Sequence, residues 1–154
     1  MEDLIEDWSQ VVAFGERTEG CRIRPSAYAL IEDDRGRVAV VRSADGIFLP
    51  GGGIEAGETL EEAIRREGLE ECGYVIQPGT WLVRAVQFSY SESEKVYFEK
   101  RSIFVEGTVL GIDLSRLEAN HELIWIKPER ANQFLSHMSH CWTVEQWRNR
   151  IRQS

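Results

Sequence analysis

The feature that most constrains the fold of this sequence is a glycine run that leads into a stretch with helical periodicity. Pro50 is followed by three consecutive glycines, and residues 58–72 then carry apolar side chains at helical spacing. Thr59 fits the N-cap position because Glu62 follows it by three residues, as in a capping box. Gly73 stands where a glycine often ends a helix. We therefore predict a helix over residues 58–72, directly after a glycine loop.

Three carboxylates make this predicted helix a candidate for metal binding. Glu67, Glu70 and Glu71 occupy positions i, i+3 and i+4, so a helix places all of them on one face. Adjacent carboxylates repel one another, and a divalent cation would relieve that repulsion. Ligands that are all oxygen favour Mg²⁺, Mn²⁺ or Ca²⁺ over zinc or copper. The spacing thus predicts a metal site on this helix.

The glycine loop supplies the second half of the predicted site. Gly52 and Gly53 can let the backbone approach a ligand closely, and a glycine-rich loop that runs into a helix commonly holds phosphate oxygens. A phosphate loop beside a metal-binding helix indicates phosphoanhydride chemistry. The metal would neutralise a polyphosphate, lower the pKa of a bound water and orient that water for attack.

The spacing of these residues resembles the signature of a known enzyme family. Gly52 is followed after five residues by Glu58, and after seven more by Arg66 and Glu67; Glu70-Glu71 and Gly73 complete the pattern. This arrangement, over residues 52–74, is similar to the Nudix box of the Nudix hydrolases, and the wider resemblance covers roughly residues 22–135.

The resemblance implies a fold and an activity. The fold would be α/β, a Nudix-type α/β/α sandwich around a central mixed β-sheet. The reaction would be hydrolysis of a nucleoside diphosphate linked to another moiety, with Mg²⁺ or Mn²⁺ as cofactor. By family role, Glu67, Glu70 and Glu71 would bind the metal, Glu58 and Arg66 would brace the loop and the helix, and the loop glycines would shape the substrate site.

The general base and the substrate contacts are less constrained by the sequence. In the family the base is either a glutamate of the box or a carboxylate from a later loop, and the later candidates here are Glu118, Glu122 and Glu99. Tyr90 lies 16 residues beyond Tyr74, a spacing that resembles a marker of diadenosine polyphosphate hydrolases. We therefore expect Tyr90 to contact substrate. Cations for phosphate could come from Arg84, Lys95, Lys100 and Arg101.

Two positions depart from the family pattern. Gly68 and Tyr74 stand where the family prefers aliphatic residues. Because glycine offers no side chain for packing and costs about 1 kcal/mol relative to alanine inside a helix, we expect Gly68 to loosen the contact between helix and sheet. It removes no ligand, so stability or rigidity should suffer more than the mechanism.

The rest of the chain reads mainly as strands. We predict a hairpin of residues 26–31 and 37–42, further strands at 47–49, 80–90, 97–109 and 122–126, and a C-terminal helix over residues 143–152, with Val144, Trp147 and Ile151 on one side. No internal repeat or linker interrupts the 154 residues, so residues 1–154 are expected to form a single domain.

Composition limits the partners and the compartment. The chain holds 18 Lys and Arg against 26 Asp and Glu, a net charge of −8, which argues against binding of a nucleic acid polymer. Six glutamates and two arginines between residues 58 and 71 account for half of that excess. No apolar run is long enough to span a membrane. Three scattered cysteines and an acidic N-terminus favour a reduced cytoplasmic protein. A homodimer is among the assemblies that the sequence leaves open.

Three functions remain compatible with the sequence. The favoured one is a nucleotide pyrophosphohydrolase that acts on a modified nucleoside triphosphate or a dinucleoside polyphosphate. The second is a catalytically silent Nudix-like domain that senses a nucleotide, and the third is an interaction domain that retains only the fold. The intact set of glutamates favours the first, because a disused site has no physical reason to keep three repelling carboxylates together.

Overall fold

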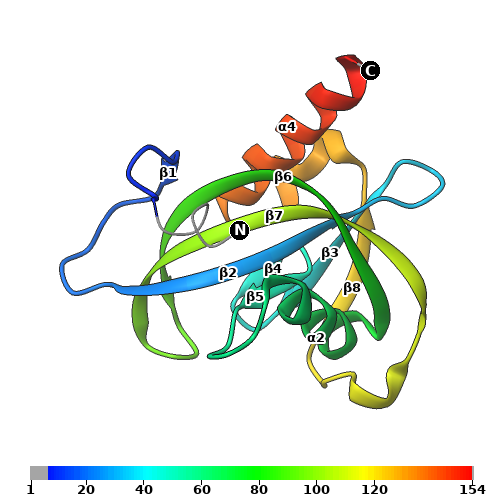
Figure 1. The fold of residues 1–154 in the computed structure, drawn as a ribbon, viewed down its shortest axis with the longest axis horizontal. Helices are drawn as coiled ribbons and strands as arrows, with labels where there is room; N and C mark the ends of the chain where they lie inside the picture. The colour runs from blue at the N-terminus through cyan, green and yellow to red at the C-terminus, as the bar shows by residue number, and fades with distance from the viewer. Residues whose placement is uncertain (1–6, 154) are drawn as a thin grey trace.

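The computed structural model describes residues 7–153, which form two β-sheets (Figure 1). The larger sheet has five strands in the order β1-β6-β7-β2-β5. These are β1 (Ala13–Phe14), β6 (Tyr74–Ser91), β7 (Val96–Ile112), β2 (Arg22–Ile31) and β5 (Gly51–Gly53). β7 is antiparallel to β6 and parallel to β2, so the expectation of a mixed central sheet is confirmed.

The smaller sheet is antiparallel and has the order β4-β3-β8. Its strands are β4 (Gly46–Phe48), β3 (Val38–Ser43) and β8 (Glu122–Ile126). The helices are α2 (Leu60–Cys72), α3 (Ala131–Phe134) and α4 (Met138–Gln153), with the short 3-10 turns η1 (Leu114–Arg116) and η2 (Pro128–Arg130). No helix within residues 7–153 is both long and apolar enough to span a membrane.

Helices α2 and α4 cover opposite faces of the larger sheet (Figure 1). Successive side chains of a strand point to opposite faces. Ala27, Ala29 and Ile31 of β2 accordingly join the apolar side of α2 in one buried cluster. Tyr28 and Leu30 join α4 in another. The two cores on either side of one mixed sheet make the α/β/α sandwich that the sequence predicts.

The predicted hairpin of residues 26–31 and 37–42 is wrong in its pairing, although both segments are strands. β2 is bonded to β7 along its whole length on one edge, and at Ser26–Tyr28 to β5 on the other, so its main partners are distant strands and not β3. The two segments share one isolated bridge, Glu32 to Val38, after which β3 turns into the smaller sheet. Local alternation finds the strands, but long-range pairing decides their neighbours.

The glycine run is also more regular than expected, because Gly51–Gly53 is a strand and not a loop. Its residues pair antiparallel with Ser26, Ala27 and Tyr28 of β2. Gly51 has φ 142°, a conformation that favours glycine, and a side chain there would collide with the carbonyl of Ala27. The run therefore forms the edge of the central sheet before the chain enters α2.

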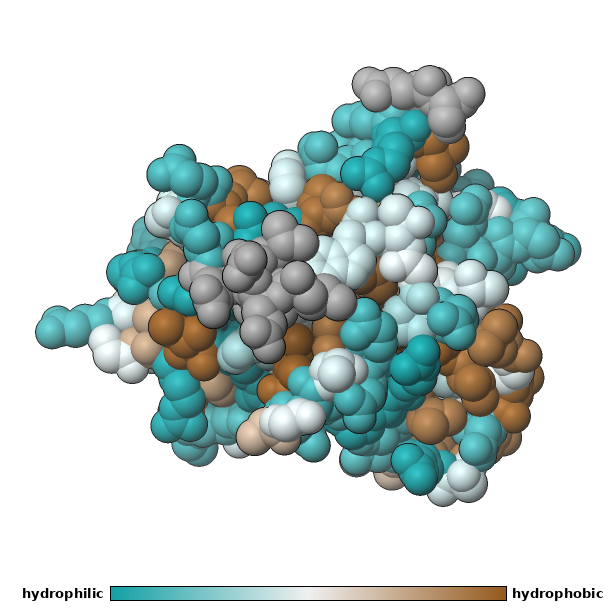
Figure 2. All heavy atoms as spheres, viewed as in Figure 1, coloured by the Kyte–Doolittle hydropathy of each residue, from teal (hydrophilic) through white to brown (hydrophobic). Residues whose placement is uncertain are grey.

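The other predicted strands and the C-terminal helix are present, although β6 begins at Tyr74 rather than residue 80. α4 begins at Met138 rather than near residue 143, and Val144 and Trp147 are buried as predicted, whereas Ile151 is 46% exposed. All three cysteines are free thiols. Figure 2 shows a mixed surface with hydrophobic groups at its right. The exposed large apolar residues include Leu110 and Ile112 at the end of β7 and Leu114 in η1.

Candidate active site

Helix α2 is held at both ends by its own sequence. The Thr59 hydroxyl accepts a hydrogen bond from the Glu62 backbone N–H at 3.1 Å, and the Glu62 carboxylate accepts one from the Thr59 N–H at 3.2 Å. Gly73 closes the helix in the left-handed conformation, with φ 69°. The predicted capping box and glycine stop are therefore confirmed. They fix the first and last turns of the helix that carries the glutamates.

Arg66 is the central cation of the site. Its Nε donates to Glu58 Oε2 at 2.7 Å, and its Nη2 donates to Glu58 Oε1 and to the Gly53 carbonyl, both at 3.0 Å. Its Nη1 donates to Glu67 and, at 3.3 Å, to Glu70. The hydrogen bond from Arg66 lowers the pKa of Glu58, and the same bond raises the pKa of Arg66. One guanidinium thus joins β5, the following loop and α2.

Glu67 and Glu71 face the glycine strand. The Glu71 carboxylate accepts a hydrogen bond from the Gly51 N–H at 2.9 Å. Glu67 lies so close to Gly52 that a side chain at position 52 would come within 2.6 Å of Glu67 Oε2. Burial raises the pKa of Glu67 to about 7, and burial followed by the charge of Glu67 raises the pKa of Glu71 well above its usual range. Burial is therefore the main reason that both carboxylates hold a proton more tightly than usual, and Arg66 offsets it only in part at Glu67.

The donors of this face suit a hard divalent cation. Glu67, Glu70 and Glu71 offer only oxygen, and burial together with the neighbouring carboxylates raises the pKa of Glu67 and Glu71. Within residues 7–153, no three His, Cys, Asp or Glu side chains are already grouped closely enough to hold a metal ion. Arg66 instead pairs with two of the three glutamates. The donor set fits the predicted metal, but a closed cage is not preformed.

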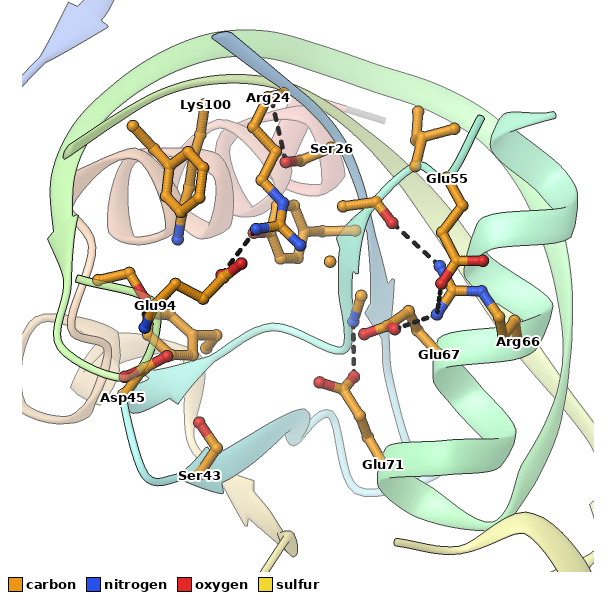
Figure 3. Close-up of a pocket in the computed structure, with 18 residues that line it drawn as sticks. Arg24, Ser26, Ser43, Asp45, Glu55, Arg66, Glu67, Glu71, Glu94 and Lys100 are labelled. Atoms are coloured by element: carbon orange, nitrogen blue, oxygen red, sulfur yellow. Dashed lines mark hydrogen bonds and ion pairs between the residues drawn. The ribbon is translucent and has the colours of Figure 1, made fainter. Parts of the chain in front are cut away.

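A pocket of about 270 Å³ opens beside Glu67 and Glu71, whereas Glu70 is held by Arg66 and does not line it (Figure 3). One side is formed by Arg66, Glu67 and Glu71 with the three glycines of β5. The other side carries Lys100, Asp45 and Glu94, as Figure 3 shows. The remaining lining residues are Arg24, Ser26, Tyr28, Ser43, Phe48, Ile54, Glu55, Ser91 and Phe98. The pocket therefore joins an anionic, metal-suited end to an end with aromatic rings and both signs of charge.

The structure separates the candidates for a general base. Glu118 donates its backbone N–H to the carbonyl of Glu70 at 2.8 Å, and its charge contributes to the raised pKa values of Glu67 and Glu71. Glu122 is exposed and lies 3.8 Å from Arg42 on the smaller sheet. Only the first of these two candidates is brought to the carboxylate face of α2.

Glu99 and Tyr90 point away from the pocket because of strand alternation. Glu99 is 3% exposed and forms ion pairs with Arg17 at 3.0 Å and Arg101 at 2.7 Å. Tyr90 is 42% exposed and packs against Tyr97, with ring centroids 4.7 Å apart. The pocket is lined instead by the next residues along each strand, which face the other way. The expected substrate contact of Tyr90 is not supported by this geometry.

Gly68 tightens the packing of α2 against the sheet, whereas the sequence suggests that it loosens it. It is buried, and a side chain there would lie 2.5 Å from Ile76 Cδ1 and 3.1 Å from the carbonyl of Tyr74. Ile76 of β6 fills the space that an aliphatic residue at position 68 would occupy. The expectation that Gly68 loosens the packing is therefore wrong: the glycine allows a close contact between α2 and β6.

Sequence reasoning missed several residues of the pocket. No motif surrounds Arg24 or Asp45, which line the pocket, or His137, which lies behind it against Lys100. Arg24 and Lys100 are brought together by the parallel pairing of β2 with β7, which aligns these two positions directly. Such a register is not visible in a single sequence, although alternation along β7 separates Lys100 from Glu99.

Comparison with known proteins adds independent evidence. The NUDIX domain matches residues 22–143. Nucleoside triphosphatase NudI of Escherichia coli O81 (strain ED1a) is 31% identical over 122 residues, covering 70% of this chain and 84% of NudI. The uncharacterized Nudix hydrolase YfcD of Escherichia coli (strain K12) is 26% identical over 143 residues, covering 82% and 73% of the two chains. A NUDIX hydrolase from Nitrosomonas europaea has a TM-score of 0.67 at 22% identity, covering 83% of this chain and 90% of its own.

The site and the comparisons agree. The matched region contains the whole of residues 52–74, including the capped helix, Arg66 with its ion pairs, and the three glutamates. Members of this family generally use a divalent metal and act on small nucleotide substrates. The chain is therefore a hydrolase and belongs to the Nudix family.

Proposed function

We propose that this enzyme hydrolyses a phosphoanhydride bond of a nucleoside diphosphate derivative with Mg²⁺ or Mn²⁺, and that its substrate is a nucleoside triphosphate. The observation that carries the proposal is the pocket that joins the glutamates of α2 to an aromatic, mixed-charge end. The name of NudI, a nucleoside triphosphatase, supports a triphosphate over the dinucleoside alternative. The geometry of Tyr90, which faces away from the pocket, removes the main argument for a dinucleoside polyphosphate.

The charges around the pocket suit a metal-bound polyphosphate. At its α2 end, Arg66 lines the pocket and is already engaged by Glu58, Glu67 and Glu70. Arg24, whose guanidinium lies against Gly53, is engaged by Glu94. A free triphosphate would therefore meet carboxylates there. A divalent cation held by Glu67, Glu70 and Glu71 would neutralise the phosphates and lower the pKa of a water for attack. We expect binding of polyphosphates to be weak without divalent metal.

Protein groups position the glutamates and accept the proton of the attacking water. Arg66 holds Glu67 and Glu70 in place and connects them to the Gly53 carbonyl. The Gly51 N–H orients Glu71. Glu118, tied to α2 through the Glu70 carbonyl, is the favoured general base, and its carboxylate would accept the proton of the attacking water. Gly52 and Gly53 have no side chains, so the Glu67 carboxylate and the Arg24 guanidinium can pack directly against the strand at the edge of the pocket.

The first test measures phosphate and pyrophosphate release from a panel of nucleoside triphosphates, with Mg²⁺ and with chelator. We expect turnover that requires the metal. Glu70→Gln and Glu71→Gln should each reduce kcat by at least about 100-fold, because each removes a charged metal ligand while nearly preserving shape. Glu61→Gln, in the first turn of the same helix and without a bond to Arg66, is the matched control and should retain normal activity.

Two results would contradict the proposal. If Glu70→Gln or Glu71→Gln kept nearly full activity with its fold intact by circular dichroism, the assigned metal roles would be wrong. If no triphosphate were hydrolysed while a dinucleoside polyphosphate was, the substrate class would be wrong. Glu118→Gln tests the base separately: it should lower kcat while leaving KM and metal affinity close to those of the unaltered enzyme.

A further inference from the structure

Lys100 occupies the end of the pocket away from α2 and is held there by a histidine. Its Nζ lies 3.2 Å from Nε2 of His137. Because an ammonium group has only donors, Nε2 must accept this hydrogen bond. Burial, followed by the charge of Lys100, lowers the pKa of His137 to about 3, so the imidazole stays neutral and able to accept. The pair is therefore directional: Lys100 donates and His137 accepts.

The surroundings of His137 keep this arrangement fixed. His137 is 9% exposed and packs on the Phe48 ring, with centroids 4.7 Å apart. The neighbouring His140 accepts a hydrogen bond from the Leu49 N–H at 3.1 Å, which ties the start of α4 to the segment after β4. The Lys100 ammonium lies 5.5 Å from the centre of the Phe48 ring. Strand β7, helix α4 and the end of β4 together determine the position of Lys100.

The other charges at this end are already paired. Arg24 donates to Glu94 at 2.7 Å, and Asp45 accepts hydrogen bonds from the Ser93 backbone and hydroxyl. Among residues 7–153, no carboxylate lies in ion-pair range of Lys100, and His137 is its one hydrogen-bond partner. Two of the three donors of the ammonium are thus available to a ligand.

The position of Lys100 in the pocket indicates which part of a bound nucleotide it would contact. If the phosphates lie at the carboxylates of α2, the opposite end of the pocket receives the base, and its deepest part meets the base edge farthest from the ribose. Arg24 lies between that end and the glycine strand, and its charge with that of Lys100 balances those of Asp45 and Glu94, which suits a neutral base better than a phosphate. Phe48 and Phe98 supply apolar surface for it.

We propose that Lys100, positioned by His137, donates a hydrogen bond to an exocyclic carbonyl oxygen of the nucleobase, and so makes the enzyme prefer oxo-bearing bases over amino-bearing ones. The inference rests on the proposed function for the orientation of the substrate. Uracil and cytosine have nearly the same shape but differ at one exocyclic position, as do hypoxanthine and adenine. An amino group at that position would place donors against the donors of Lys100, whereas a carbonyl would accept from them.

The test compares matched bases in the intact enzyme. We expect kcat/KM for UTP to exceed that for CTP, and kcat/KM for ITP to exceed that for ATP. A hydrogen bond to a charged group is typically worth 1.5–3 kcal/mol, so Lys100→Met should reduce both ratios by about tenfold or more. Lys100→Arg should retain a preference for oxo-bearing bases. Lys127→Met, an exposed lysine outside the pocket, is the control and should leave both ratios unchanged.

His137 is tested as a positioning residue through the same ratios. His137→Phe keeps a ring against Phe48 but removes the acceptor, so it should lower the UTP/CTP ratio in the same direction as Lys100→Met. His137→Gln, which restores an acceptor, should recover part of the preference. A purely structural role for His137 would change kcat/KM for all four nucleotides alike and leave the ratios constant.

A binding measurement separates failure of this inference from failure of the proposed function. Titration calorimetry with UMP, CMP, IMP and AMP needs no turnover, and the unaltered protein should bind the oxo-bearing member of each pair more tightly. The inference would be overturned if the unaltered protein bound the two members of each pair equally, bound none of them, or kept its preference in Lys100→Met. An equal loss for all triphosphates in Lys100→Met would also overturn it, because that would place Lys100 on the phosphates.

Discussion

At the scale of single residues, the packing of α2 depends on a glycine with an unusual neighbour. Gly68 is buried against Ile76, whose Cδ1 would lie 2.5 Å from any side-chain carbon at position 68. The helical glycine is unfavourable by about 1 kcal/mol relative to alanine in isolation. Here it allows the isoleucine of β6 to occupy the space between helix and sheet. Which residue is tolerated at position 68 therefore depends on the side chain at position 76.

Gly68→Val should destabilise the protein by about 1–3 kcal/mol, because the added side chain must displace a buried neighbour and the Tyr74 backbone. Urea unfolding measures the change. The double variant Gly68→Val with Ile76→Ala should be more stable than the sum of the two single changes indicates, since the alanine makes room for the valine.

Gly111→Val is the matched control, because an added side chain there would meet nothing within 4 Å. It should leave the free energy of unfolding within about 0.5 kcal/mol of the starting value. The explanation for Gly68 fails if Gly68→Val is as harmless as the control, or if the two changes at positions 68 and 76 are simply additive.

At the scale of elements, sequence reasoning located the helix and most strands because their signals are local. The capping box at Thr59 and the stop at Gly73 mark α2 to within two residues, and alternation marks β8. Strand partners are not local: β2 pairs with β7, about 75 residues away, and not with the nearby β3. The metal-suited face could be predicted from one helix, whereas the Lys100 end of the pocket needed the β2–β7 register.

The capping box gives a prediction for α2 as an element. Thr59→Ala removes the hydroxyl that accepts from the Glu62 N–H, so it should destabilise the protein by about 1 kcal/mol. Because the bonds are reciprocal, Thr59→Ala and Glu62→Ala should not be additive in a double-mutant cycle followed by urea unfolding. Thr80→Ala, at an exposed position of β6, is the control for loss of a threonine. Strict additivity would show that the two side chains stabilise the helix independently.

At the scale of the whole molecule, two buried groups with shifted pKa values change the free energy of unfolding in opposite directions as the pH falls. His137 has a pKa of about 3 in the folded protein, mainly because of burial, against 6.5 when unfolded. Between these values the unfolded chain binds a proton that the folded chain does not, so acid favours unfolding. Glu67, with a pKa raised to about 7 from 4.5, binds its proton in the folded state first, so acid favours folding through that group. The net pH profile is therefore a difference of opposing contributions.

The contribution of His137 can be isolated by comparing the protein with His137→Gln, whose amide oxygen can still accept from Lys100. From about pH 7.5 to about pH 4.5, the stability of the unaltered protein should fall by about 2.5 kcal/mol relative to that of the variant, because only the histidine must remain neutral while buried. Urea unfolding at both pH values measures this difference. The carboxylates of α2 are present in both proteins, so their opposite effect cancels. Between about pH 7.5 and pH 8.5 the histidine is neutral folded or unfolded, and the gap between the two proteins should not change. If the difference in stability between the two proteins also stayed constant down to pH 4.5, His137 would be taking up its proton in the folded state. The imidazole that accepts from Lys100 would then be accessible to water.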